Sequence, residues 1–262
     1  MIKQTKDNRS MFLPLDRQPK YVWPDNYGKG LPNYMALTDT WSTFGFDIES
    51  KGLDPFQKDV FVISCAVAPE GYCFVTALNH NGYATPNISD SYTQLGTLQR
   101  LVENFKVILI GHNIKFDLKW LAVKYGWQIN CQVFDTMMAS YLLNENDSAG
   151  LDACMERYLG QSSHKGMVNT FDLESEHIDD VLLYNAKDAE TESKLCRAQI
   201  PLLEKEGLLP LMVLANQVFP ILTRMEIRGV NLDRPYAKTT EKQLLEDCVK
   251  DRVVIGRSGY GV

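Results

Sequence analysis

Three short polar patches, widely separated in the sequence, hold acidic residues that any fold of this chain has to place. They occupy residues 46–49, 113–117 and 184–188 and contain D-x-E, N-x-x-F-D and Y-x-x-x-D in that order. Asp47 and Glu49 end an apolar run, and on a strand residues two apart leave the same face. In the other patches the polar residues are four apart, the spacing of one helical face: Asn113 with Asp117, and Tyr184 with Asp188.

Taken singly, each patch also has an ordinary structural interpretation. The first could lie on a solvated strand face. Asn113 could cap the start of a helix, and Asp117 could complement the dipole of that helix from its first turn. The third could be a half-buried tyrosine beside a surface acid. The three patches together, in this order and separation, favour one shared site.

Such a site would gather four carboxylates, and their charge has to be neutralised at neutral pH. Divalent metal ions are the usual means of doing so. Two ions held by carboxylates are the standard apparatus of phosphodiester hydrolysis. The sequence therefore predicts two divalent metal ions, Mg²⁺ or Mn²⁺, at four acids: Asp47, Glu49, Asp117 and Asp188.

Composition disfavours several classes of protein. No run of about 18 apolar residues occurs, so no membrane span is expected. Residues 1–6 are polar, which disfavours secretion. The six cysteines are scattered and favour free thiols in a reducing compartment over a structural zinc site. We expect a cytoplasmic protein, in the host cytoplasm if the chain is phage-encoded, with no membrane partner.

The net charge of −6 argues against a long footprint on duplex nucleic acid, because its sign opposes bulk electrostatic binding. The negative charge does not argue against binding of a short single-stranded end. Formal charge counts the acids and omits any metal ions that they bind.

The order of predicted elements indicates an α/β fold. Apolar and β-branched runs predict a three-stranded meander at 42–48, 60–68 and 72–76, followed by short strands at 107–111 and 132–134. Helical spacing alternates with and follows these strands, at 92–105, 113–125, 136–143, 151–159 and 178–206. This pattern suits a ribonuclease H-like mixed five-stranded sheet flanked by helices.

Three regions are expected along the chain. Residues 1–40 are predicted to be an irregular extension, 41–206 one α/β domain, and 207–262 a helical C-terminal extension with a flexible tail. The segment 208–228 has the pattern of an amphipathic helix. Its apolar face has to pack on its own domain, on a second copy or on a partner: Leu211, Leu214, Val218, Leu222 and Met225.

The combined motifs resemble the DEDD superfamily of 3′–5′ exonucleases, and most of all the proofreading domain of family A DNA polymerases of the bacterial DNA polymerase I type and its phage relatives. The matching stretches are 46–53, 111–117, 134–143, 151–160 and 184–189. The likeness covers about 41–206 and continues into 211–233, which looks like the bridge to a polymerase. No polymerase motif follows, so polymerisation by this chain is not expected.

The resemblance implies a role for each residue of the acidic site. Asp47 would bridge both metal ions, Glu49 and Asp188 would complete the first, and Asp117 would serve the second. Tyr184 would orient the attacking water. Leu183 stands where the sister DEDDh subclass has histidine, so the chain resembles the DEDDy group.

The resemblance also implies a substrate site. Leu53 matches the residue that wedges between the last two bases, and Asn113 one that contacts the 3′-terminal nucleotide. His112 stands in place of a common glutamine, and Lys115 and Phe116 belong to the same motif. Asp135, although in a motif, is expected to be structural.

The implied reaction is stepwise release of 5′-mononucleotides from a single-stranded DNA 3′ end, as in proofreading during DNA replication. Three rival interpretations stay open: RNA 3′-end trimming, a non-catalytic docking module, and one subunit of a split enzyme with a separate DNA polymerase subunit.

Overall fold

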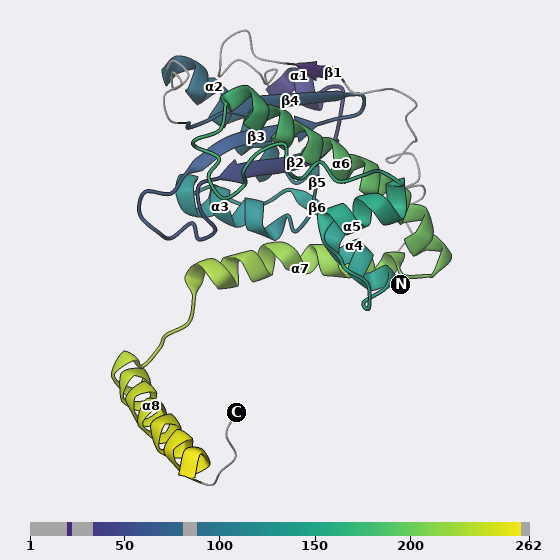
Figure 1. The fold of residues 1–262 in the computed structure, drawn as a ribbon. Coiled ribbons are helices and arrows are strands. Elements are labelled where there is room, and N and C mark those ends of the chain that lie inside the picture. Colours follow the sequence, from purple (N-terminus) through teal and green to yellow (C-terminus); the bar gives the residue numbers. More distant parts are fainter. Residues whose placement is uncertain (1–19, 23–33, 81–87, 258–262) are drawn as a thin grey trace, which may run out of the picture. The chain divides into compact units, whose positions relative to one another are not determined.

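The computed structural model describes residues 20–22, 34–80 and 88–257 (Figure 1). The chain divides into two compact units, 1–227 and 228–262. The sequence-based boundary at 206/207 lies one helix earlier, because the helix that follows it packs within the first unit.

The first unit is built on a six-stranded sheet with the strand order β1-β4-β3-β2-β5-β6. Strands β2, β3 and β4 form the expected antiparallel meander, and β5 and β6 run parallel to β2. The mixed five-stranded sheet is therefore confirmed. The strands are β1 (Lys20–Val22), β2 (Thr43–Ser50), β3 (Val62–Ala68), β4 (Tyr72–Ala77), β5 (Ile108–Gly111) and β6 (Gln132–Asp135).

The sixth strand comes from the segment 1–40, which was expected to be irregular. Residues 20–22 pair in parallel with the outer edge of β4, which would otherwise present unpaired backbone groups. The same segment supplies a short helix, α1 (Tyr34–Thr38). A three-residue strand carries too little periodicity to be seen in the sequence.

Helices cover both faces of the sheet. The long helix α6 (Ile178–Lys205) crosses one face, as Figure 1 shows. The opposite face carries the main core, which includes side chains from α2 (Ile88–Glu103) and α3 (Lys115–Tyr125). The remaining helices are α4 (Thr136–Leu143), α5 (Leu151–Cys154) with a π-helical turn (Met155–Leu159), α7 (Leu209–Arg228) and α8 (Arg234–Arg257).

Successive side chains of β2 point to opposite faces of the sheet. Phe44, Phe46 and Ile48 are buried in the main core. The intervening residues therefore leave the other face, the one that α6 covers. This alternation places Asp47 and Glu49 against α6, as the sequence predicts.

Gly45 lies where α6 crosses β2. A Cβ atom at this position would lie 2.1 Å from the carbonyl oxygen of Ala189 and 2.5 Å from Oγ of Ser193. The missing side chain therefore lets α6 approach the sheet closely enough to present its polar face to β2.

We expect Gly45→Ala to destabilise the protein by about 1–3 kcal/mol or more, because the added methyl must push α6 off the strand. Denaturant unfolding measures the change. Gly96→Ala is the matched control: among the described residues, no atom other than its chain neighbours and its own helix backbone lies within 4 Å of its Cβ position, and alanine favours a helix. Equal stability of Gly45→Ala and wild type would contradict the close approach.

Helix α7 packs within the first unit through residues outside the apolar face that the sequence indicates, a face whose packing partner the sequence left open. Met212, Phe219 and Thr223 are its buried residues, and Phe219 belongs to the main core. Most of the predicted apolar face is exposed: Leu211, Leu214, Leu222 and Met225. The described residues of the first unit therefore leave these four side chains exposed.

The cysteines are all free, and only Cys248 is exposed. Among the described residues, no helix combines the length and the apolar character needed to cross a membrane.

Candidate metal centre

Asp47 is held at the end of β2 by groups from two neighbouring elements. Asn185 of α6 donates a hydrogen bond from Nδ2 to Oδ2 of Asp47 at 2.5 Å, and Ser64 of β3 donates to Oδ1 of Asn185 at 3.1 Å. The register of pairing between β2 and β3 shifts between Glu49 and Ser50, so Asp47 and Glu49 lie next to the point where regular pairing ends. The site therefore occupies the irregular end of β2.

Helix α6 adds the third acid. Asp188 and Tyr184, one turn apart, are both buried. Asp47, Glu49 and Asp188 each offer a carboxylate oxygen, and these atoms all lie within 4.8 Å of one another. The first and third patches of the sequence thus meet in one cluster.

Asp117 joins from the first turn of α3. It is buried, and its Oδ1 accepts a hydrogen bond from the backbone N–H of Ile48 at 3.2 Å, directly between the two acids of β2. Its charge raises the pKa of both Asp47 and Glu49. All four predicted acids are therefore neighbours, although Asp117 lies outside the tight group of three.

Asn113 is not the helix cap that its position suggests. Its φ is 63°, and α3 starts at Lys115 after an N-cap residue, Ile114, that makes no side-chain cap bond. The backbone N–H groups of Asn113 and Ile114 donate instead to the Asp135 carboxylate at 3.2 and 3.1 Å. Asn113 tolerates this left-handed turn better than most residues do.

Asp135 has the structural role that we expect from the sequence. It is fully buried at the N-cap of α4, where its Oδ1 accepts hydrogen bonds from the N–H groups of Met137 and Met138. Because it also accepts from the turn before α3, one carboxylate fixes the starts of two helices.

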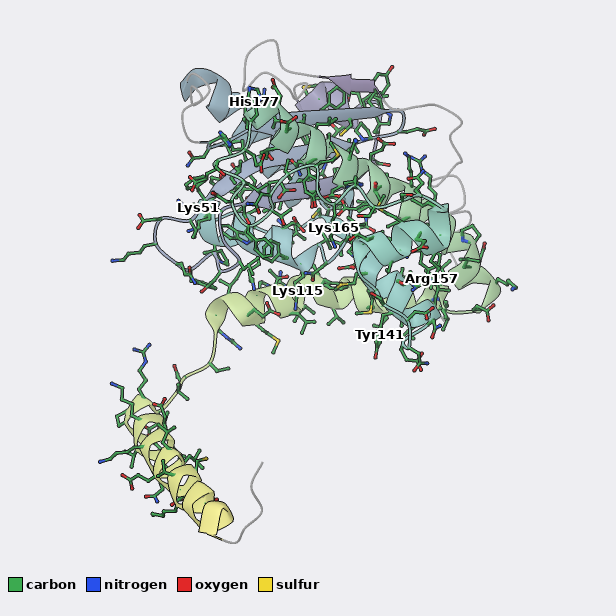
Figure 2. The ribbon with its side chains drawn as sticks, in the orientation of Figure 1. Lys51, Lys115, Tyr141, Arg157, Lys165 and His177 are labelled. Atoms are coloured by element: carbon green, nitrogen blue, oxygen red, sulfur yellow. The ribbon has the colours of Figure 1, made fainter. Side chains whose placement is uncertain are left out.

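The predicted substrate residues fall into different environments. Leu53 lies in the loop after β2 and is 84% exposed. Lys115, labelled in Figure 2, is paired with Glu226 of α7 at 2.5 Å. Phe116 is half-buried against Trp120 and the main core. Packing thus accounts for Phe116 without any substrate.

His112 is held beside the site. Its Nδ1 lies 2.9 Å from Oγ1 of Thr136, and its backbone N–H donates to Oε1 of Glu192 at 2.9 Å. Burial lowers the pKa of the His112 imidazole to about 4. The ring is therefore neutral at physiological pH and brings no positive charge to the acids.

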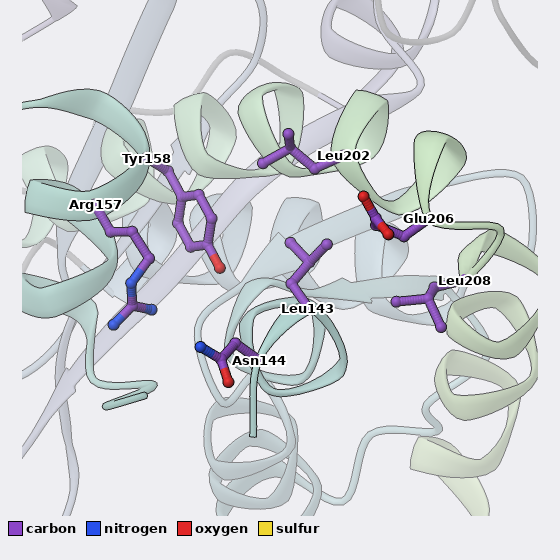
Figure 3. Close-up of a pocket in the computed structure, with 7 residues that line it drawn as sticks. All are labelled: Leu143, Asn144, Arg157, Tyr158, Leu202, Glu206 and Leu208. Atoms are coloured by element: carbon purple, nitrogen blue, oxygen red, sulfur yellow. The ribbon is translucent and has the colours of Figure 1, made fainter. Parts of the chain in front are cut away.

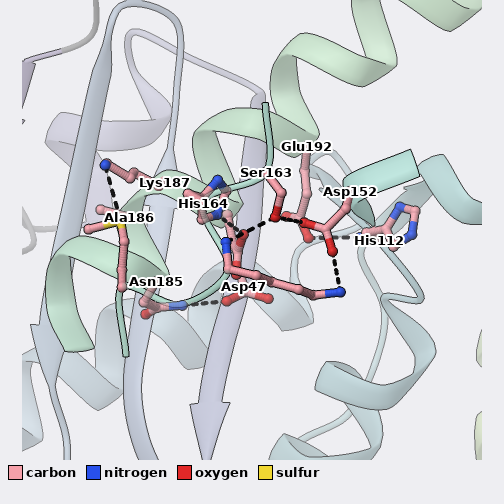
Figure 4. A network of polar contacts seen from close by, with 12 residues as sticks. Asp47, His112, Asp152, Ser163, His164, Asn185, Ala186, Lys187 and Glu192 are labelled. Carbon is pink, nitrogen blue, oxygen red and sulfur yellow. Dashed lines mark hydrogen bonds and ion pairs between the residues drawn. The ribbon is translucent and has the colours of Figure 1, made fainter. Parts of the chain in front are cut away.

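His164 is a site residue that the sequence patterns missed. Its Nε2 lies 2.5 Å from Oδ1 of Asp188, and its ring stands edge-on to Tyr184 with the ring centroids 5.5 Å apart. Figure 4 labels His164 within the same network of polar contacts as Asp47. It comes from the loop between the π-helical turn and α6. A lone histidine in a loop has no spacing that would have pointed to it.

The electrostatics of the acids favour a bound cation. The pKa values of Asp47 and Glu49 are raised well above their ordinary range, first by burial and then by the neighbouring carboxylates. Burial likewise raises the pKa of Asp117, although the Ile48 N–H bond opposes it. Crowded carboxylate oxygens are hard donors, the kind that Mg²⁺ and Mn²⁺ prefer.

The crowding of these acids predicts that the thermal stability of the protein depends jointly on pH and on bound metal. Because the folded pKa values exceed the unfolded ones, the acids' contribution to stability is full below about pH 4 and is lost as the pH rises through the raised values. We therefore expect the gain in Tm on adding Mg²⁺ to grow between about pH 5 and 8. Thermal melts in EDTA and in Mg²⁺ measure it, and a pH-independent gain would contradict the account.

A separate pocket of about 460 Å³ lies away from the acids (Figure 3). Its polar groups already have partners, since Arg157 donates to Oγ of Ser140, which also lies 3.3 Å from the Tyr158 hydroxyl. None of the four acids lines it. The lining residues are Leu143, Asn144, Arg157, Tyr158, Leu202, Glu206 and Leu208.

Comparison with known proteins gives a consistent picture. The family model of the 3′–5′ exonuclease of DNA polymerase A matches residues 29–199. DNA polymerase I of Rhizobium leguminosarum is 29% identical over 247 residues, which cover 84% of this chain and 24% of that protein. The chain spans about a quarter of the length of the curated relatives it matches.

Solved structures share the fold. NrnC of Brucella melitensis bound to pGG has a TM-score of 0.59 at 23% identity, covering 80% of this chain and 92% of that chain. Escherichia coli RNase D, an exoribonuclease involved in structured RNA processing, has a TM-score of 0.58 at 11% identity, covering 79% and 51%. At these identities the likeness shows the ribonuclease H-like fold.

Proposed function

This chain belongs to the 3′–5′ exonuclease family of the family A DNA polymerases, and from that premise we propose that it removes 5′-mononucleotides from single-stranded DNA 3′ ends. The observation that carries the proposal is the meeting of Asp47, Glu49 and Asp188 within 4.8 Å, with Asp117 beside them. The biological role that we propose is proofreading during DNA replication.

The four acids would hold two divalent metal ions, Mg²⁺ or Mn²⁺. Asp47, Glu49 and Asp188 form the tighter group, and Asp117 would serve the second ion together with Asp47. When bound, such ions activate water and stabilise the charge of phosphodiester hydrolysis. The chain supplies fixed carboxylates, of which Asp47 is held by Asn185 and Asp117 by the backbone of β2.

Tyr184 would orient the attacking water. Burial and the charges of Asp188, Glu49 and Asp47 raise the pKa of its hydroxyl, so the group stays protonated and can donate a hydrogen bond. Leu53, exposed in the loop after β2, would pack between the last two bases, and such apolar packing is tolerant of sequence. Asn113 and His112 would border the 3′-terminal nucleotide.

A polymerase is the partner that a proofreading nuclease serves. The exposed apolar residues of α7 (Leu211, Leu214, Leu222 and Met225) are the surface that we propose for it, whether it is a separate subunit or part of a longer chain.

RNA 3′-end trimming is the second candidate function, and the structural likeness to RNase D favours keeping it. The likeness to DNA polymerase I favours DNA. The deciding test is the rate of digestion of two 5′-labelled single strands of one sequence, one DNA and one RNA, by the same preparation. Faster digestion of DNA supports the proposal, and faster digestion of RNA overturns its substrate class.

A further inference from the structure

The loop between the π-helical turn and α6 brings His164 into contact with two residues of the metal centre. Its Nε2 lies 2.5 Å from Oδ1 of Asp188, and its ring makes an edge-on contact with the ring of Tyr184. Only 13% of the His164 side chain is exposed. The imidazole is therefore packed against one acid of the centre and against the tyrosine one turn before it.

The hydrogen bond runs from the imidazole to the carboxylate. An ionised carboxylate only accepts, so Nε2 of His164 has to donate to Oδ1 of Asp188. The neutral ring with its hydrogen on Nε2 and the protonated ring can both make this bond. The contact therefore does not depend on the charge of the ring, and it leaves Oδ2 of Asp188 outside the bond.

His164 is not itself placed as a metal ligand. Among the described residues, the ligand atoms that converge within 4.8 Å come from Asp47, Glu49 and Asp188, and the His164 ring is not one of them. Any influence of His164 on a bound cation therefore passes through the carboxylate of Asp188.

Two chain neighbours of His164 are fixed to α5 by one carboxylate. The Ser163 hydroxyl donates to Oδ1 of Asp152 at 2.5 Å, and the ammonium group of Lys165 pairs with Oδ2 of Asp152. The backbone N–H of Lys165 also donates to Oγ of Ser163 at 3.0 Å. Figure 4 shows Asp152, Ser163 and His164 in this network. Asp152 thus holds the residues on both sides of the histidine.

We propose that His164 is a positioning residue of the metal centre, whose Nε2–H holds the Asp188 carboxylate in the orientation that binds a divalent cation. Asp152 in turn holds His164 through its two neighbours. This inference rests on the proposed function, because it assumes that Asp188 binds metal. It adds to the centre a loop that the D-x-E, N-x-x-F-D and Y-x-x-x-D patches do not contain.

The test is Mn²⁺ binding, measured by calorimetry and by the electron paramagnetic resonance signal of free Mn²⁺. His164→Phe keeps a ring against Tyr184 but removes the donor, and we expect it to bind at least one ion about tenfold or more weakly than wild type. His164→Gln is the matched control, because its amide can place a donor near the position of Nε2. We expect it to restore most of the affinity.

The role of Asp152 has its own test. Asp152→Ala should also weaken Mn²⁺ binding, and it should add little to the loss in a double variant with His164→Phe, because it acts through the histidine. Unchanged affinity in Asp152→Ala, or a fully additive loss in the double variant, would overturn the role of Asp152.

Unchanged affinity in folded His164→Phe would overturn the inference, and so would an equal loss in His164→Gln, since the donor would then not matter. Circular dichroism verifies folding. If His164→Phe does not fold, His164→Leu takes its place with the same expected and overturning results. Asp47→Asn separates these failures from failure of the metal centre: if it binds Mn²⁺ as wild type does, the proposed function itself falls.

Discussion

Asp47→Asn is expected to lower the rate of DNA 3′-end digestion by about a thousandfold or more, since it removes the acid that both metal ions would share. Asparagine keeps the size of the side chain. In the metal-free state the protein should be as stable as wild type or more so, because the change relieves repulsion among crowded carboxylates.

The measurement is the initial rate on a 5′-labelled DNA strand at saturating Mg²⁺, with thermal melts in EDTA to confirm folding. Asp180→Asn provides the matched control, because Asp180 is an exposed acid on α6. A folded Asp47→Asn protein with the rate of wild type would show that the activity does not depend on this carboxylate cluster.

Tyr184→Phe is expected to lower kcat by about a hundredfold to a thousandfold with little change in KM, because only the hydroxyl that orients the water is lost. The ring of Tyr184 packs in a small core with Ile63, Val181 and Leu173. Phenylalanine keeps that packing, so the free energy of unfolding should change little.

Single-turnover digestion at saturating DNA measures kcat without product release. Tyr141→Phe serves as the control, because Tyr141 is exposed on α4. If Tyr184→Phe digests DNA within about twofold of the wild-type rate, well below the hundredfold expected of a lost donor, the orienting role is wrong.

Much of this fold could be predicted because its signals are local and periodic. The alternation of β2, the apolar β3 and the long helical spacing of α6 each repeat over many residues. Asp47 and Glu49 lie two apart on β2, Asp188 lies four residues after Tyr184 on α6, and Asp117 lies in the first turn of α3. Their convergence follows from the order of the elements in a mixed sheet.

The parts that could not be predicted depend on contacts between distant residues. The sequence position of Asn113 suggests a helix cap. In the structure the Asp135 carboxylate, at the end of β6, accepts hydrogen bonds from the backbone N–H groups just before α3. The sequence indicates one apolar face of α7 that includes Leu214 and Leu222, but Phe219, outside that face, is the residue that reaches the main core. His164 reaches Asp188 from a loop with no periodicity.

The central claim is that these acids support metal-dependent hydrolysis from a DNA 3′ end, and a time course on 5′-labelled single-stranded DNA tests it most directly. In Mg²⁺ the account predicts a ladder that shortens one nucleotide at a time from the 3′ end and releases 5′-mononucleotides, and it predicts no digestion in EDTA. Intact DNA after incubation with folded protein in Mg²⁺ or Mn²⁺, or a ladder that persists in EDTA, would contradict it.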